Sequence, residues 1–258
     1  MGEYITVEVC CGSADDAARA FLAGADRIEL NCALDAGGLT PSLGLLESAL
    51  DNAPLPVVCM VRPRAGGFCY SALEFDCMLR DARALCAAGA AGLAFGCLTQ
   101  DGRIDRERCA RLIDAAGDAQ TVFHRAFDVL RGEPEADVET LVRLGFTRIL
   151  TSGRRPAAPD GADCIRRCAL AAANRIEILA GGGVRENNAA ALVTATGVRQ
   201  LHFSCHTTVC DCSASGSAVH FNAPATASET SVSVVDTARL SDFVEMLRKI
   251  EYPKDVKI

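Results

Sequence analysis

The segment Thr121-Val-Phe-His-Arg-Ala-Phe-Asp128 opens a unit that continues through Ala136–Leu144 to Arg148-Ile-Leu-Thr-Ser-Gly153. Its first residues form a short apolar run, typical of a buried strand, that ends in polar side chains. The middle run has apolar residues at helical spacing, and Gly145 follows it, where a helix commonly ends. The last apolar run again ends in polar residues, so the segment predicts a strand, a helix and a second, parallel strand.

The same order of strand and helix recurs along the whole chain. Helix-like segments separate apolar runs that begin near Ile5, Arg27, Val57, Gly92, Thr121, Arg148, Arg175 and Gln200. Repeated βα units predict a parallel sheet, and eight of them in 258 residues suit a closed barrel better than an open, doubly wound sheet. We therefore predict an α/β fold in which residues 1–258 form one TIM-type (β/α)8 barrel domain.

The segment after the eighth predicted strand breaks this order. Residues 204–231 are rich in Ser, Ala, Thr and Cys and show little periodicity. They follow a strand, and βα loops lie at the mouth of a barrel. The sequence predicts a long irregular loop over the mouth, followed by a closing helix at Thr237–Ile250.

Composition argues against several classes of protein. The net charge is −7, the isoelectric point is about 5.2 and no Lys/Arg run occurs, which argues against a nucleic-acid partner. No apolar stretch approaches the ~20 residues of a membrane span, and the first residues lack the pattern of a secretory signal. We expect no membrane partner and a cytoplasmic location, where the 14 cysteines stay mostly reduced.

Two glutamates lie within apolar strands. Glu8 stands in the strand that begins near Ile5, and Glu29 in the strand that begins near Arg27. A carboxylate inside a barrel is costly unless it is paired. Two interpretations stay open, a buried ion-pair network that fixes strand register or a functional site at the carboxyl ends of the strands. The nearby cations are Arg62, Arg64 and Arg125.

Small residues end the sixth and seventh strands, as Thr151-Ser-Gly153 and Gly181-Gly-Gly183. Glycines let backbone N–H groups approach a ligand closely, and barrels commonly bind phosphate near these loops. A tight turn is the alternative interpretation. The pattern favours an anion site, so we expect a small anionic molecule as a partner.

Histidine occurs at two strand ends. His124 lies beside Arg125 and close to Asp128, and His202 comes two residues before Ser204. Imidazole is the usual proton carrier near neutral pH, which makes His124 a candidate for acid–base chemistry. A structural, hydrogen-bonded His124 is the alternative.

Cysteine and histidine concentrate at residues 202–212, which have the pattern His-x-x-Cys-His-x-x-x-Cys-x-Cys. Thiolate and imidazole suit Cu(I) or Zn(II), but this spacing matches no standard zinc motif. Cys10, Cys11 and Cys32 on the first two strands form a second candidate pocket. For both groups the alternative is plain packing, because free Cys is among the most buried residue types.

Several motifs together resemble those of the CutC family. They are Gly24-Ala-Asp-Arg-Ile-Glu-Leu30, Gly37-Gly-Leu-Thr-Pro-Ser42, Arg62-Pro-Arg64 with Gly67-Phe68 and Tyr70-Ser71, Asp101-Gly102, Phe123-His-Arg-Ala-Phe-Asp128, Ile149-Leu-Thr-Ser-Gly153 and Gly181-Gly-Gly-Val184. The resemblance runs from about Val7 to Ser204. It implies a cytosolic TIM-type barrel that forms a homo-oligomer, a dimer or tetramer, and takes part in copper homeostasis.

The resemblance also implies a copper site. Copper binding in the family is attributed to cysteines that end the first two strands, and Cys10 matches the first of them. The second follows Ile-Glu-Leu directly in the family, whereas this chain has Asn31 there and Cys32 one residue later. A one-residue shift can turn a side chain to the other face of a strand. With that departure, the predicted Cu(I) ligands are Cys10 and Cys32.

An enzyme is the alternative function. It would act on a small phosphorylated or carboxylated metabolite in the barrel mouth, by an isomerase-, lyase- or hydrolase-type step. Proton transfer would fall to Glu8, Glu29, His124 and Asp128. A non-catalytic ligand sensor is a third alternative. The predicted ligand-binding residues are Arg62, Arg64, Arg125, Thr151, Ser152, Gly153, Gly182, Gly183, His202 and Ser204.

Overall fold

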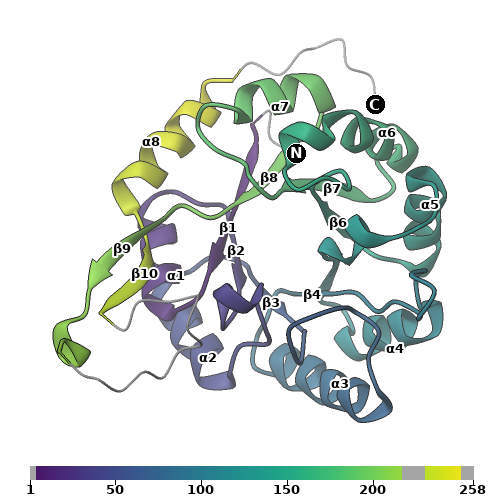
Figure 1. Ribbon diagram of the computed structural model, residues 1–258, viewed down its shortest axis with the longest axis horizontal. Helices are drawn as coiled ribbons and strands as arrows, with labels where there is room; N and C mark the ends of the chain where they lie inside the picture. Colours follow the sequence, from purple (N-terminus) through teal and green to yellow (C-terminus); the bar gives the residue numbers. More distant parts are fainter. Residues whose placement is uncertain (1–3, 217–229, 251–258) are drawn as a thin grey trace.

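The computed structural model describes residues 4–216 and 230–250 and contains a closed barrel of eight parallel strands (Figure 1). Each strand pairs with the next in chain order, and the eighth pairs with the first. The predicted TIM-type barrel is therefore confirmed. The strands are β1 Thr6–Cys11, β2 Arg27–Leu30, β3 Val57–Met60, β4 Gly92–Phe95, β5 Gln120–Phe123, β6 Arg148–Thr151, β7 Glu177–Gly181 and β8 Gln200–Phe203.

Helices surround the barrel and bury their apolar faces against the outer side of the strands (Figure 1). Local sequence sets where they begin. For example, the Ser71 side chain accepts from the Glu74 N–H while the Glu74 carboxylate accepts from the Ser71 N–H, a capping box. The helices are α1 Ala14–Leu22, α2 Leu43–Asn52, α3 Ala72–Ala87, α4 Arg106–Ala116, α5 Pro134–Leu144, α6 Ala162–Ala172, α7 Ala189–Thr196 and α8 Thr237–Arg248.

The inside of the barrel is divided between apolar and polar side chains. Because successive residues of a strand point to opposite faces, alternate positions face the barrel axis. From β3 to β7 these positions hold a small apolar cluster, made of Val58, Met60, Ala94, Val122, Leu150 and Leu179. On β1, β2 and β8 charged and polar side chains contact one another instead, namely Glu8, Cys10, Arg27, Glu29, Gln200 and His202.

A set of polar side chains, the polar belt, joins strands near their amino ends. Its buried members are Glu8, Arg27, Arg148 and Gln200, and the half-buried Glu177 and the exposed Gln120 complete it. Arg27 donates to Glu8 and, at 2.8 Å, to Gln200. Arg148 donates to Gln200 at 3.1 Å, to Glu177 at 2.7 Å and to Gln120 at 3.1 Å. A buried ion-pair network, one of the two interpretations of Glu8, is therefore present.

The chain after β8 differs from the predicted irregular loop. Residues His206–Cys210 form β9, which pairs antiparallel with β10, Ser231–Val235. The prediction for 204–231 is therefore wrong at these residues, while 217–229 lie outside the described residues. We call this pair of strands the ribbon. Buried Asp16 of α1 anchors it, because the Asp16 carboxylate accepts from the Val235 N–H at 2.7 Å.

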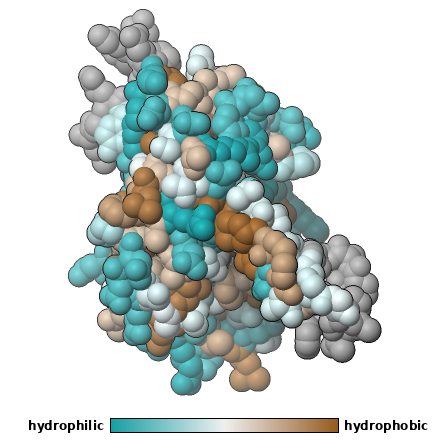
Figure 2. All heavy atoms as spheres, turned by 90° about the vertical axis from the view of Figure 1, so that its left-hand side faces the viewer, coloured by the Kyte–Doolittle hydropathy of each residue, from teal (hydrophilic) through white to brown (hydrophobic). Residues whose placement is uncertain are grey.

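The outer face that carries this ribbon is mixed in character. Figure 2 shows apolar side chains among hydrophilic ones there. Val209 and Val232, which pair across the ribbon, are 41% and 47% exposed. No helix within the described ranges combines the length and the apolar character needed to cross a bilayer.

Candidate functional site

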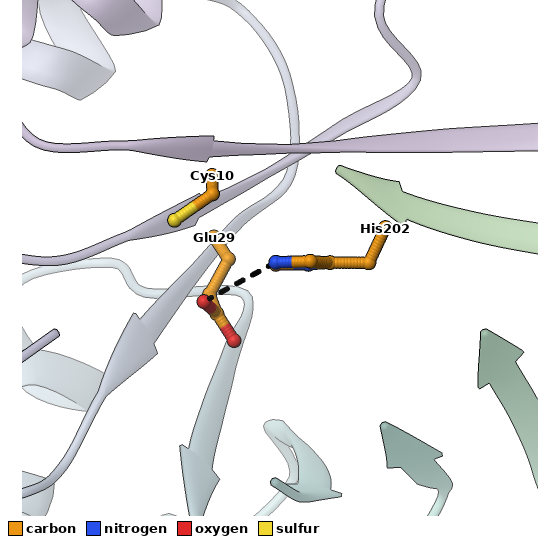
Figure 3. A group of neighbouring side chains, drawn as sticks. All are labelled: Cys10, Glu29 and His202. Carbon is orange, nitrogen blue, oxygen red and sulfur yellow. Dashed lines mark ion pairs between the residues drawn. The ribbon is translucent and has the colours of Figure 1, made fainter. Parts of the chain in front are cut away.

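Three potential metal ligands meet inside the barrel, on neighbouring strands. Cys10 comes from β1, Glu29 from β2 and His202 from β8, and Figure 3 shows the Glu29 carboxylate facing the His202 ring, with Cys10 beside Glu29. Strand register explains this, because Cys10 pairs with Glu29 on one side of β1 while Glu8 pairs with His202 on the other. One ligand atom from each residue lies within 4.8 Å of the other two. We call these three residues the Cys–Glu–His cluster.

Side chains next to the cluster hold its members in place by hydrogen bonds. Glu8 lies 2.8 Å from Nδ1 of His202, which leaves Nε2 on the side of Glu29, 3.9 Å away. The Asn31 amide donates to Glu29 at 3.0 Å and contacts the Cys10 sulfur at 3.5 Å. A carboxylate behind a histidine and an amide behind a carboxylate are common outer partners of metal sites.

Burial and charge shift the protonation of the cluster. Burial works to lower the pKa of His202, but the Glu29 charge and hydrogen bonds that the ring donates to Cys10 and Glu8 raise it well above its usual range. Burial raises the pKa of the Glu29 carboxyl and of the Cys10 thiol. Without a metal, the cluster is therefore an imidazolium held between carboxyl groups, beside a neutral thiol.

Cys32 is not a member of the Cys–Glu–His cluster. The Cys32 thiol donates to the backbone carbonyl of Thr40 at 3.0 Å, and Cys11 is buried on the opposite face of β1 from Cys10. The amide of Asn31 lies beside Cys10 instead. The one-residue shift thus replaces the predicted second thiol with an amide.

The other residues of the 202–212 cluster are dispersed. Cys205 is buried near Asp236, and the His206 ring lies between the Cys10 carbonyl and the Ser233 hydroxyl, each 3.1 Å away. Cys210 and Cys212 lie exposed, with their sulfurs 3.0 Å apart. Within the described residues, the Cys–Glu–His cluster is the one group of three such ligands.

The family model for CutC matches residues 5–207. The chain belongs to the CutC family. A CutC family protein of Treponema denticola is 50% identical over 200 residues, covering 78% of this chain and 81% of that protein. The human copper homeostasis protein cutC homolog is 42% identical over 202 residues, covering 78% and 74%. The crystal structure of a CutC copper homeostasis protein from Streptococcus agalactiae aligns with a TM-score of 0.73 at 36% identity, over 77% of this chain and 98% of that one.

Family membership confirms the CutC resemblance predicted from the sequence motifs. The matched range contains all members of the Cys–Glu–His cluster and every predicted site residue. It ends within β9, so most of the ribbon and all of α8 lie beyond it.

The predicted anion-binding arginines of this CutC family member are engaged by the protein itself. The two terminal nitrogens of Arg62 donate to backbone carbonyls, three of them in residues 36–38 and one at Gly66. Arg64 forms an ion pair with Glu74 and also donates to the carbonyls of its own loop. Both residues therefore order the loops that follow β2 and β3.

Asp128 organises the loop after β6. Its carboxylate accepts from the Thr151 hydroxyl at 2.5 Å, from the Ser152 N–H at 3.0 Å and from the Ser152 hydroxyl at 2.9 Å. Arg125 donates to Asp128 and to Ser152, both at 2.8 Å. The structure brings these four predicted residues together, but it uses Asp128 as an acceptor that fixes the loop.

The predicted glycines serve close backbone packing. A Cβ at Gly153 would overlap the backbone of Gly161, and a Cβ at Gly183 would lie 2.7 Å from the Ala157 side chain. Gly182 has a φ of +92° and approaches the Arg125 guanidinium. Ser204 is exposed. The tight-turn interpretation therefore accounts for Gly153, Gly182 and Gly183.

His124 is a buried neutral histidine. Its Nδ1 accepts from the Ala126 N–H at 3.2 Å, while its Nε2 has no partner among the described residues. Burial, with a contribution from Arg62, lowers the pKa of His124 to about 3. It is therefore uncharged at neutral pH.

Sequence reasoning misses two functional candidates. Asn31 stands out in the sequence only for replacing a cysteine, yet its amide contacts two members of the cluster. Tyr70 belongs to one of the family motifs, yet its hydroxyl is buried and unpaired among the described residues. A polar residue at an inward position just past a strand is the available signal for Asn31, whereas nothing in the sequence indicates the burial of Tyr70.

Proposed function

We propose that the Cys–Glu–His cluster binds a copper ion and that the protein acts in copper handling. The observation that carries this proposal is the convergence of a thiol, a carboxylate and an imidazole within 4.8 Å of one another. They come from three separate βα units, so the barrel, and not a local loop, sets the geometry.

The donor set fits a transition metal. Thiolate and imidazole favour copper or zinc over magnesium or calcium, and copper is bound most tightly in the order of divalent first-row metals. The Nε2 atom of His202 faces Glu29 while Glu8 contacts Nδ1, the usual arrangement of an imidazole ligand with a carboxylate behind it. Three protein ligands leave one position open for exchange of the metal with a partner.

The names of the relatives support copper as the metal. The human relative and the Streptococcus agalactiae protein both carry copper homeostasis in their names. The ligand set proposed here is nevertheless different from the predicted Cys10 and Cys32, because Cys32 is not among the three converging ligands and its thiol contacts the Thr40 carbonyl.

Anaerobic Cu(I) titration against a chromophoric chelator tests the proposal, with Zn(II) titrated in parallel. Cys10→Ser should weaken copper binding by about 100-fold or more, because loss of an outer partner alone costs ~10–100-fold. Cys32→Ser is the matched control and should leave the affinity unchanged. Equal affinities of the wild-type protein and the Cys10→Ser variant, or binding of Zn(II) alone, would contradict the proposal.

The enzyme alternative keeps one specific observation in its favour. His202 stands between two carboxylates, Glu8 at 2.8 Å and Glu29 at 3.9 Å, inside the barrel. A row of carboxyl and imidazole groups can accept and release a proton during a reaction. Turnover of a small metabolite stays a prediction.

A further inference from the structure

Three buried hydrogen-bond donors near β3 and β5 lack a partner among the residues that the structure describes. They are Nε of Arg62, the hydroxyl of Tyr70 and Nε2 of His124. These residues are only 7%, 4% and 3% exposed. Buried polar groups in proteins are nearly always paired, so three unpaired groups in one region of the barrel mouth require an explanation.

Arg62 also lacks a counter-ion. Its terminal nitrogens donate to carbonyl oxygens at 2.8–3.1 Å, and it forms no ion pair with any described carboxylate. Carbonyl dipoles satisfy N–H groups but do not neutralise a charge. A buried cation without an anion is costly, so the fold holds a positive charge that an anionic ligand would compensate.

All three unpaired groups are donors. The Ala126 N–H donates to Nδ1 of His124, so the neutral ring carries its proton on Nε2. Burial raises the pKa of Tyr70, which keeps its hydroxyl protonated. Nε of Arg62 always carries a hydrogen. An acceptor is therefore what this region lacks.

Arg62 and His124 contact the same ring, and Tyr70 lies in the same loop as that ring. The Phe68 ring centroid lies 4.9 Å from the His124 ring and 5.3 Å from Cζ of Arg62. Phe68 and Tyr70 belong to the same loop between β3 and α3. Gly96, after β4, makes room for the His124 ring, since a Cβ there would lie 2.9 Å from two of its atoms.

We propose that Arg62, Tyr70 and His124 bind the carboxylate or phosphate group of a small metabolite. The positive charge selects an anion, and several donors suit the several acceptor oxygens of one oxyanion. This site is distinct from the Cys–Glu–His cluster, since none of its residues belongs to that cluster, and it does not rest on the copper proposal.

The two sites are nevertheless neighbours. The Asn31 amide contacts Cys10 and Glu29, and its side chain packs so closely on Gly38 that no Cβ fits there. The Gly38 carbonyl in turn accepts from Arg62 at 3.1 Å. Contacts through Asn31 and Gly38 therefore connect the two sites.

Calorimetric titration of the full-length, metal-free protein with inorganic phosphate and with acetate, in chloride at constant ionic strength, tests this site. Tyr70→Phe removes one unpaired hydroxyl and should weaken binding of the preferred anion by about tenfold. Without an anion, its stability should be unchanged or higher, because the hydroxyl forms no internal bond. Tyr4→Phe, the same change at an exposed residue, should alter neither property.

The outcomes separate the possible sources of the oxyanion. Tight binding of phosphate alone indicates a phosphate ester, and binding of acetate alone indicates a carboxylate. A second variant, His124→Asn, retains an acceptor for the Ala126 N–H and should also lose affinity. Absence of binding by either anion, wild-type affinity in both variants, or a loss of anion-free stability in Tyr70→Phe would overturn the proposal. Loss of copper binding in Cys10→Ser leaves this result unaffected, so the two proposals fail independently.

Discussion

The folded protein keeps a single residue, His124, uncharged at neutral pH. Burial first, and then the charge of Arg62, lower its pKa to about 3, against ~6.5 in an unfolded chain. Below pH ~6.5 His124 is therefore protonated in the unfolded chain, whereas in the folded protein it stays neutral down to about pH 3. The contribution of His124 to stability is complete above pH ~6.5 and falls by about 1.4 kcal/mol per pH unit below it.

Urea unfolding of the wild-type protein and of His124→Asn at pH 5, 5.75 and 6.5 measures this effect, in a buffer without oxyanions. The free energy of unfolding should fall less steeply in the variant as the pH is lowered. His202, whose pKa is raised, is protonated in both states below pH ~6.5 and adds no slope there. Parallel curves for the two proteins would show that His124 is not held neutral.

At the same scale, the sequence predicts site residues inside strands better than site residues in the loops that follow them. Glu8, Glu29 and His202 are recognisable because a charged or polar residue inside an apolar strand alternates toward the barrel axis. Cys32 lies past the end of β2, where the loop turns and strand alternation no longer applies, so its role as a ligand stays a prediction. The sequence indicates Arg62 only as a ligand contact, since most of the loop carbonyls around it come from residues that are distant in sequence.

At the scale of elements, the turn after β6 depends on two glycines in close contact. Gly153 has a φ of +69°, and a Cβ there would overlap the backbone of Gly161 at the end of the 3-10 turn Ala158–Gly161. Gly153→Ala should therefore destabilise the protein by about 3 kcal/mol, from the strained backbone and the steric overlap together.

Thermal unfolding of Gly153→Ala beside Gly44→Ala checks this prediction. Gly44 lies in α2, and a Cβ added there would have nothing within 4 Å, so the same change should raise stability by up to ~1 kcal/mol. Equal stabilities for the two variants would show that Gly153 is not required by packing.

Elements are predictable where they repeat and not where they occur once. Each βα unit repeats an apolar run and an amphipathic helix, so all eight barrel strands are located within two residues of their starts. Strand β9 is missed, because it is only half-apolar, is mostly exposed and finds its partner more than 20 residues later. No local sequence pattern predicts a pairing between strands that are so far apart in the chain.

At the scale of the whole molecule, the polar belt closes the barrel. Glu8 on β1 contacts Arg27 on β2 and His202 on β8, so it spans the seam where the last strand meets the first. Sequence reasoning finds Glu8 but not its belt partners, because an arginine or glutamine at the start of a strand is equally typical of an exposed flank. Only closure of the barrel brings these strand starts together.

Glu8→Gln should therefore lower stability more than the same change in an exposed ion pair. It leaves the buried Arg27 without an anion, which costs about 3 kcal/mol, whereas Glu245→Gln alters a carboxylate that is 71% exposed, beside a similarly exposed Lys249, and should change stability little. Burial works to raise the pKa of Glu8, but Arg27, His202 and Arg148 hold it well below its ordinary value. Its contribution is therefore present above pH ~4.3 and is lost as the pH falls further. In urea unfolding, the difference in the free energy of unfolding between wild type and Glu8→Gln should be largest at pH 7 and become smaller below pH ~4. A difference that does not depend on pH would mean that the charge of Glu8 does not stabilise the seam.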